Sequence, residues 1–348
     1  MTEKQILELL KNINYPGFTR DIVSFGMVDN IAIDKDTVEI TLSIDTKNND
    51  LKSQLTNQIT ELISSETDKL KIIVNIQESK TDKSQTIKTN KQAPTPKVLD
   101  NIKHVIAVSS GKGGVGKSTV AVNIASILSE NYKVGILDLD IYGPSLPMLM
   151  GIQEVPSFTE DEKIIPLEKH NIKLMSFGFI SGNQAPVIWR GPLVGRMTKQ
   201  FIDDVIWGEL DFLILDLPPG TGDVQLTLSQ TLELTGAIIV TTPQELAVLD
   251  VKKGTDMFRK VNTPVLGIVE NMSHFLCPHC NQKSLIFSQG GGKKESERSE
   301  IPLLGQIPLS QALVESSDEG NPFVFKFPKS EITSIYKDVV SKIINNIG

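Results

Sequence analysis

A glycine-rich loop between a buried strand and a helix constrains this chain more than any other feature. An apolar run, His104–Ser109, precedes the loop, and a helical stretch, Val120–Glu130, follows it. The loop fits the pattern GxxxxGK[ST] in the strand–loop–helix context that this pattern requires. Its glycines let the backbone wrap closely around phosphate oxygens, and its exposed amides form an anion-binding nest. The sequence therefore predicts a nucleotide-phosphate site made by Gly111, Lys112, Gly113, Gly114, Val115, Gly116, Lys117, Ser118 and Thr119.

The two lysines of this loop have different expected roles. Lys117 is expected to reach the β and γ phosphates of ATP, and Ser118 is expected to hold Mg²⁺. A standard loop of this kind does not need a lysine at the position of Lys112. In the deviant Walker A class, this second lysine crosses a dimer interface and stabilises charge on the partner's transferring phosphoryl group. We therefore expect a homodimer closed by ATP, with Lys112 and Lys117 as catalytic cations.

Carboxylates follow two other apolar strands. The run Phe212–Leu215 and the next residue, Asp216, form a Walker B arrangement, in which Asp216 acts on Mg²⁺ through water. Asp138 and Asp140 lie at the end of the strand Val134–Leu139. We expect Asp138 to contribute to the magnesium site and Asp140 to orient the attacking water or the metal. A lone aspartate after a strand is often a helix cap, so the prediction depends on its combination with the phosphate loop.

Two further segments complete the predicted nucleotide site. Pro218–Gly222 follows Asp216 and is expected to form a loop that senses the γ phosphate. Asn271 follows the strand Val265–Glu270. An amide side chain there can both donate to and accept from an adenine edge, although an ordinary turn position explains this asparagine equally well.

Strands and helices alternate from about residue 104 to the end of the chain. Runs such as Phe-Leu-Ile-Leu do not alternate with polar residues, as expected for strands buried on both faces. This order is typical of an α/β fold with a doubly wound, mostly parallel sheet, here of the P-loop NTPase kind. The predicted strands are His104–Ser109, Val134–Leu139, Ile172–Phe177, Phe212–Leu217, Ala237–Thr242 and Val265–Glu270.

A smaller α/β domain is predicted ahead of this sheet. Residues 1–77 show the order α-β-β-α-β, with a hairpin around Asp34-Lys35-Asp36. Residues 78–103 are predicted to form a flexible linker. The lysine-rich stretch 79–97 has too few apolar residues for their burial to offset the entropy lost on ordering the chain. A solvated tether explains this stretch better than a basic strip that touches nucleic acid or acidic partners. The ATPase domain would then span residues 104–348.

The chain has only two cysteines, and they form the motif Cys277-Pro278-His279-Cys280. Thiolates at this spacing can bind one soft metal centre. An iron–sulfur cluster or a zinc site needs four ligands, which two copies of the chain supply together. His274 and His279 could instead complete a Cys2His2 zinc site within one chain. A redox-active dithiol and two inert cysteines are the remaining alternatives.

Composition narrows the classes of function. Lys and Arg number 35 and Asp and Glu 42, for a net charge of −7, which does not favour a general nucleic-acid binder. No apolar run approaches the roughly 18 residues of a transmembrane helix. Glu3, Glu8 and Asp21 interrupt the N-terminal region, unlike a standard signal peptide. We expect a cytoplasmic protein with no nucleic-acid or membrane partner.

Several of these segments resemble the Mrp/ApbC family of P-loop iron–sulfur cluster carriers, which is related to MinD and ParA. They lie in the family's order over about 104–325 and read SSGKGGVGKST, DLDIYGPSLPMLMG, WRGP, WGELDFLILDLPPGTGDVQLTLSQ, TTPQELAVLDVKKG, FRKVNTPVLGIVENMS and CPHC. The resemblance implies ATP binding, slow hydrolysis and a homodimer. It also implies a [4Fe-4S] cluster held by Cys277 and Cys280 of both subunits and delivered to apoproteins.

Residues 1–77 resemble the iron–sulfur assembly domain that often precedes this ATPase, most clearly in DIVSFGMV at 21–28. Asn14-Tyr15-Pro16 stands where that domain usually has Asp-Pro, and Asp45-Thr46-Lys47-Asn48 stands where it often has a cysteine. No cysteine precedes Cys277, so this domain cannot ligate a cluster through thiolates. A role in docking or client binding is expected.

Two relatives of the family act differently. A MinD-like membrane cycler needs a basic amphipathic C-terminal helix, but the apolar stripe in 330–347 has a polar face of mixed charge. We expect this helix to pack on its own domain. A ParA-like DNA partitioner needs a basic surface, which the net charge does not favour. Neither alternative explains Cys277 and Cys280.

Overall fold

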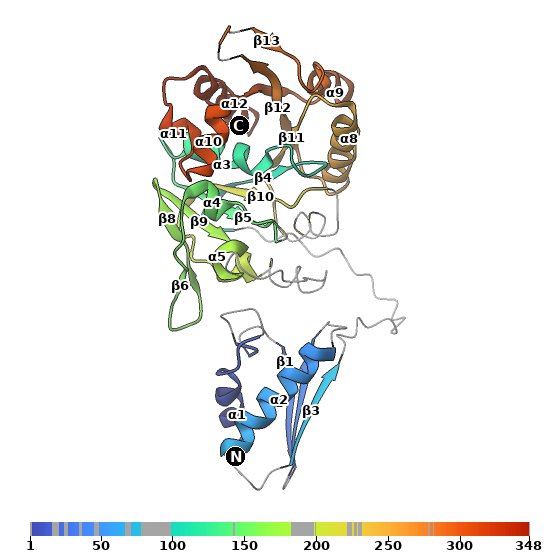
Figure 1. Ribbon diagram of the computed structural model, residues 1–348, viewed down its shortest axis with the longest axis vertical. Coiled ribbons are helices and arrows are strands. Elements are labelled where there is room, and N and C mark those ends of the chain that lie inside the picture. Colours follow the sequence, from blue (N-terminus) through green and yellow to red (C-terminus); the bar gives the residue numbers. More distant parts are fainter. Residues whose placement is uncertain are drawn as a thin grey trace. The chain divides into compact units, whose positions relative to one another are not determined.

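Figure 1 shows a computed structural model of the chain. The structure describes residues 2–15, 21–23, 27–34, 37–44, 49–66, 71–77, 99–141, 143–181, 198, 200–220, 225, 228, 232–277, 279–280 and 282–347. Two compact units are distinguished, Met1–Asn90 with Ile180–Leu193, and Lys91–Phe179 with Val194–Gly348. Residues 78–98, which make up most of the predicted linker, lie outside the described residues. The predicted domain boundaries therefore stay a prediction.

The first unit is a three-stranded sheet with two helices. Its elements follow the order α1 (Glu3–Leu10), β1 (Val28–Asp34), β2 (Thr37–Ser43), α2 (Asn49–Glu66) and β3 (Lys71–Gln77). The sheet order is β1-β2-β3, with β1 antiparallel and β3 parallel to β2. A capping box between Thr2 and Gln5 starts α1, and the apolar stripes of both helices are buried, as at Ile6, Leu55 and Ile59. The unit thus has a hydrophobic core of its own.

The second unit is built on a nine-stranded sheet. Its order is β13-β12-β11-β4-β10-β5-β9-β8, and β14 also pairs with β12. All pairs are parallel except β8 with β9 and β12 with β13. This arrangement confirms the predicted mostly parallel α/β sheet. The strands are β4 (Ile102–Ser109), β5 (Val134–Asp138), β8 (Leu167–Lys169), β9 (Ile172–Ser176), β10 (Leu210–Asp216), β11 (Gly236–Thr241), β12 (Val265–Leu276), β13 (Lys283–Ser284) and β14 (Leu303–Leu309).

Helices cover both faces of this sheet (Figure 1). Successive residues of β11 point to opposite faces, and all of them are buried. Ile238 and Val240 join the core beneath α3 (Lys117–Leu128) and α12 (Glu331–Ile347), whereas Ile239 joins Val251 of α8 (Glu245–Lys260). The other elements are α4 (Leu146–Met150), β6 (Ser157–Phe158), β7 (Ile164–Ile165), α5 (Phe177–Ser181), α9 (Gly291–Ser299), α10 (Gln311–Asp318) and α11 (Phe323–Lys326).

The C-terminal helix α12 packs on its own domain, as its mixed polar face indicated. Tyr336, Val339 and Ile343 are fully buried, and the helix contacts β14 and α3. Among the described residues, no helix has both the length and the apolar character needed to cross a bilayer. Because β4, β5, β10, β11 and β12 are parallel, their carboxyl ends meet at one edge of the sheet. Asp138 and Asp216 are the last residues of β5 and β10, and the phosphate loop follows β4. Asn271, which was expected to follow its strand, lies inside β12 instead.

Candidate functional site: a nucleotide pocket and a cysteine hairpin

The phosphate loop joins the end of β4 to the start of α3, as the motif predicted. Gly116 is the N-cap of α3 and has a left-handed backbone, with φ of 79°. A Cβ atom there would lie 2.3 Å from Nδ2 of Asn271, so only glycine fits. A Cβ atom at Gly111 would lie 2.2 Å from Cβ of Asp250 in α8. The loop is therefore held tightly between β12 and α8.

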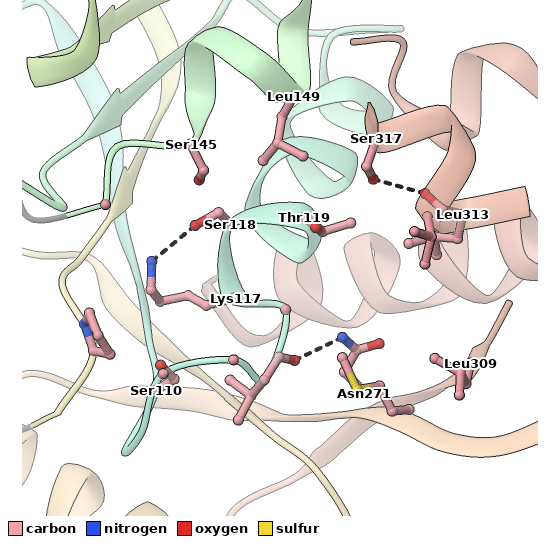
Figure 2. A pocket seen from close by; sticks show the side chains of 18 of the residues that line it. Ser110, Lys117, Ser118, Thr119, Ser145, Leu149, Asn271, Leu309, Leu313 and Ser317 are labelled. Carbon is pink, nitrogen blue, oxygen red and sulfur yellow. Dashed lines mark hydrogen bonds between the residues drawn. The ribbon is translucent and has the colours of Figure 1, made fainter. Parts of the chain in front are cut away.

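A pocket of about 440 Å³ opens over this loop (Figure 2). Its wall includes Gly113–Thr119, Asp140 and Asn271, all of which the sequence predicted. The opposite wall comes from residues 308–318, at the end of β14 and in α10. These wall residues carry no recognisable motif, and sequence reasoning missed them. A concave pocket of this size with a few polar groups is typical of a small-molecule site.

Three predicted groups meet around Lys117, and two of them, Lys117 and Ser118, line the pocket. Lys117 Nζ lies 2.5 Å from Asp216 Oδ1, and it donates a hydrogen bond of 3.2 Å to Ser118 Oγ. The side chains of Lys117 and Asp216 are 6% and 3% exposed, so their charges are balanced within the protein. Asp216 lies directly beside Asp138 in the pairing of β10 with β5. The structure thus brings the phosphate-loop lysine and the Walker B carboxylate together.

Asp138 is fully buried, and both of its oxygens accept hydrogen bonds. Oδ1 accepts from the amide of Asp140 at 3.0 Å, and Oδ2 accepts from the amides of Ser145 and Leu146 at 3.1 Å. Ser176 Oγ also donates to Oδ2. Burial, followed by the charge of Asp216, raises the pKa of Asp138 to about 7. These bonds fix the loop that leads into α4 and make Asp138 the cap of that helix, the alternative role that an aspartate after a strand often has.

Asp140 lines the pocket, whereas Lys112 is not among its lining residues. Asp140 is part of the pocket wall, and its Oδ1 accepts a hydrogen bond of 3.3 Å from the amide of Gly143. Lys112 Nζ donates to Gln244 Oε1 at 2.8 Å within the same chain. Gln244 is the residue just before α8. The sequence offered no signal for this contact, which holds Lys112 against α8.

Asn271 supports the phosphate loop directly. Its Nδ2 donates a hydrogen bond of 2.8 Å to the carbonyl oxygen of Val115, and the residue is 6% exposed. The residue also lines the pocket, so its predicted contact with an adenine edge stays a prediction. Met272 follows with a left-handed backbone, φ 55°, where the pairing of β12 with β14 shifts register. Sequence reasoning treated Asn271 as a base contact or a turn residue and missed its loop contact.

The two cysteines lie in the connection between β12 and β13, which pair as an antiparallel hairpin. Cys277 donates its amide to the carbonyl of Gln282 at 3.1 Å. Both thiols are free, and Cys280 is exposed. Hydrogen bonds from the amide of His279, then from the amide and the thiol of Cys280, lower the pKa of Cys277. The hairpin therefore presents a pair of thiols, and the lowered pKa makes the metal-binding thiolate form of Cys277 more accessible than that of an ordinary cysteine.

The alternative of a zinc site within one chain finds no support here. Nδ1 of His274 lies 3.0 Å from Ser273 Oγ. Within the described ranges, no three His, Cys, Asp or Glu side chains come together in a way that could hold a metal ion. Pro278 and the loop residues Thr221 and Gly222 lie outside the described residues, as does the WRGP segment at 189–192.

Comparison with known proteins gives two family matches. The NUBPL iron-transfer P-loop NTPase family matches residues 101–344, and an iron–sulfur cluster assembly protein family matches residues 3–69. The chain is 48% identical over 256 residues to an iron–sulfur cluster carrier protein of Aquifex aeolicus, covering 73% of this chain and 70% of that one. It is 38% identical over 340 residues to the iron–sulfur cluster carrier protein of Escherichia coli K12, covering 96% and 89%.

Solved structures give the same fold. A nucleotide-binding protein of Archaeoglobus fulgidus in complex with ADP is 40% identical, with a TM-score of 0.58 over 65% of this chain and 90% of that one. The cell-division ATPase MinD of Pyrococcus furiosus is 21% identical with a TM-score of 0.52, which bears on the fold alone. These matches confirm the predicted fold class and the predicted nucleotide-hydrolase class. The larger family match contains the phosphate loop, both aspartate strands and both cysteines, and this chain belongs to the NUBPL iron-transfer P-loop NTPase family.

Proposed function

We propose that this protein carries iron–sulfur clusters to apoproteins and that it binds and slowly hydrolyses ATP as a homodimer in the cytoplasm. The observation that carries the proposal is the position of the chain's only two cysteines in one hairpin connection, where Cys277 is half-buried and Cys280 is exposed. The nucleotide pocket is formed separately by the phosphate loop. The names of the Aquifex and Escherichia relatives, iron–sulfur cluster carrier proteins, support the same function.

The proposed cargo is a [4Fe-4S] cluster shared between two copies of the chain. Such a cluster takes four thiolates, and one chain offers two. A second copy that brings its own hairpin to the first completes the set. A cluster held between two surface turns stays near solvent, which favours transfer to a client protein.

Within the nucleotide site, each predicted residue has a proposed task. Lys117 exchanges its partner Asp216 for the β and γ phosphates, and the amides of the loop bind the phosphate oxygens. Asp140 positions the attacking water from the pocket wall, and Asp138 holds the loop on which Asp140 lies. Lys112 acts on the nucleotide of the partner, after it leaves Gln244.

A magnesium ion fits the oxygen donors at this end of the pocket. Ser118 Oγ and Asp216 Oδ1 each lie within hydrogen-bonding distance of Lys117 Nζ, and they are the hard oxygen ligands that Mg²⁺ prefers. When bound, the ion would neutralise phosphate charge. Asp138 was also expected to take part, and its bonds to backbone amides favour a supporting position behind these two residues.

The experiment that tests the cargo is anaerobic reconstitution with iron and sulfide, followed by metal and sulfide analysis and a mass measurement. We expect about four irons per dimer, lost in Cys277→Ala and in Cys280→Ala, because each change removes two of four ligands per dimer. ATP binding should survive in both variants. His279→Ala is the matched control and should keep its cluster. One tightly held zinc per monomer that His279→Ala removes would contradict the proposal.

A further inference from the structure

Ser145 lies at the N-cap of α4, yet its side chain makes no capping bond. A serine at this position normally accepts a hydrogen bond from an amide in the first turn of its helix. Here the amides of Ser145 and Leu146 donate to Asp138 instead, and Pro147 has no amide hydrogen to donate. The start of α4 is therefore capped by Asp138, which leaves the Ser145 hydroxyl available for another partner.

The hydroxyl of Ser145 is shielded from solvent and has no hydrogen-bond partner among the described residues. Buried polar groups in native proteins are nearly always paired, and an unpaired one calls for an explanation such as an absent ligand. A hydroxyl can donate one hydrogen bond and accept two, so phosphate oxygens are suitable partners. The position of Ser145 in the pocket wall makes a bound nucleotide the natural partner.

The Ser145 hydroxyl points toward the end of the pocket that holds Ser118 and Lys117 (Figure 2). Asn271, Leu309 and Leu313 lie at the opposite end. Lys117 belongs to the part of the loop that binds the outer phosphates, so this end receives the end of the phosphate chain.

We propose that the Ser145 hydroxyl donates a hydrogen bond to the terminal phosphate of a bound nucleoside triphosphate and thereby distinguishes it from a diphosphate. This inference rests on the nucleotide binding proposed above. A diphosphate has no phosphate group at this position, so its binding affinity does not depend on the hydroxyl. Asp138 keeps α4 in place in either state, so the hydroxyl is positioned before the nucleotide arrives.

The test compares Ser145→Ala with wild type in the full chain, using calorimetric titration with a non-hydrolysable ATP analogue and with ADP, both in the presence of Mg²⁺. We expect the affinity for the triphosphate to fall about tenfold or more and the affinity for ADP to stay within about twofold, because a hydrogen bond to a charged phosphate is lost only in the triphosphate complex. Ser145→Thr retains a hydroxyl and should recover most of the loss. Ser126→Ala is the matched control, since that buried hydroxyl donates to Val122 O within α3.

Two results would overturn the inference. Equal losses for both nucleotides, accompanied by a lower unfolding temperature without nucleotide, would make Ser145 a structural residue. If Ser145→Ala bound both nucleotides with wild-type affinity, the hydroxyl would make no contact with the terminal phosphate. If wild-type protein bound neither nucleotide, the proposed function would fail instead, so the two failures are distinguishable.

Discussion

Lys117, which lines the nucleotide pocket, forms an ion pair of 2.5 Å with Asp216, and both side chains are almost fully buried. The pair joins the first residue of α3 to the last residue of β10. The lysine charge is thus balanced by a carboxylate that itself lies beside Asp138. The lysine therefore stabilises two neighbouring acidic groups.

Lys117→Ala should destabilise the protein in the absence of nucleotide. Removing one partner of a buried ion pair leaves the other charge uncompensated, which lowers the free energy of unfolding by about 3–5 kcal/mol. Adding Asp216→Asn should recover part of this loss, and urea unfolding measures both. Lys253→Ala is the control, because its ion pair with Asp250 is exposed and should contribute less than about 1 kcal/mol. Equal stability of Lys117→Ala and wild type would show that the buried pair is not formed in solution.

Asn271→Ala should weaken nucleotide binding, because the carbonyl of Val115 in the phosphate loop loses its buried donor. One such bond corresponds to about 1 kcal/mol, or roughly fivefold in affinity for both ATP and ADP. Asn346→Ala is the matched control, since Asn346 Nδ2 donates at 2.9 Å to the carbonyl of Leu266, a residue that does not line the pocket. Comparable affinities in the two variants would contradict a supporting role for Asn271.

Lys112→Ala should keep most of its ATP affinity and lose hydrolysis. The lysine lies against Gln244 in its own chain, and its proposed target is the partner's nucleotide. Removing one group that stabilises transition-state charge reduces turnover by about a hundredfold or more. Phosphate release by the dimer measures this, with Lys103→Ala as a surface-lysine control. If Lys112→Ala hydrolysed ATP at the wild-type rate, Lys112 would not act on the nucleotide of the partner.

Cys277 should react with iodoacetamide at a lower pH in the folded protein than in the unfolded chain. The amide of His279, followed by the amide and thiol of Cys280, lowers the pKa of Cys277 in the folded state, so its thiolate is populated at lower pH. Alkylation rates of metal-free Cys280→Ser, which leaves Cys277 as the single thiol and keeps the two amide donors, are measured across pH in buffer and in urea. The pH at which alkylation reaches half its maximal rate should be lower in buffer than in urea. An equal or higher pH in buffer would contradict the hydrogen bonds to Cys277 in the hairpin.

A chain that begins near residue 98 should still dimerise, hydrolyse ATP and hold a cluster. Every residue proposed for the nucleotide and the cluster follows Ser109, and the first unit has its own buried core at Ile6 and Ile59. Reconstitution of this shortened chain beside the full chain measures cluster content and ATPase rate. Loss of cluster binding in the shortened chain would show that residues 1–77 contribute to the cluster site.

The phosphate loop, the Walker B aspartate and the cysteine motif could be recognised in the sequence because each is a contiguous pattern. The strand, loop and helix around Gly111–Thr119 form one unbroken segment, and Asp216 directly follows its apolar run. The buried strands could be predicted for the same reason, since hydrophobic patterning is a property of neighbouring residues.

The partners of these residues were decided by the tertiary structure. Asn271 is 156 residues from Val115, Gln244 is 132 residues from Lys112, and Asp216 is 99 residues from Lys117. These contacts depend on the order of β12, β11, β4, β10 and β5 in the sheet, which places distant strand ends at one edge. Even the availability of the Ser145 hydroxyl depends on Asp138 from β5. Local pattern thus determined which chemical groups this protein has, and strand order determined what each group touches, because side-chain hydrogen bonds form only between groups that the fold brings within reach.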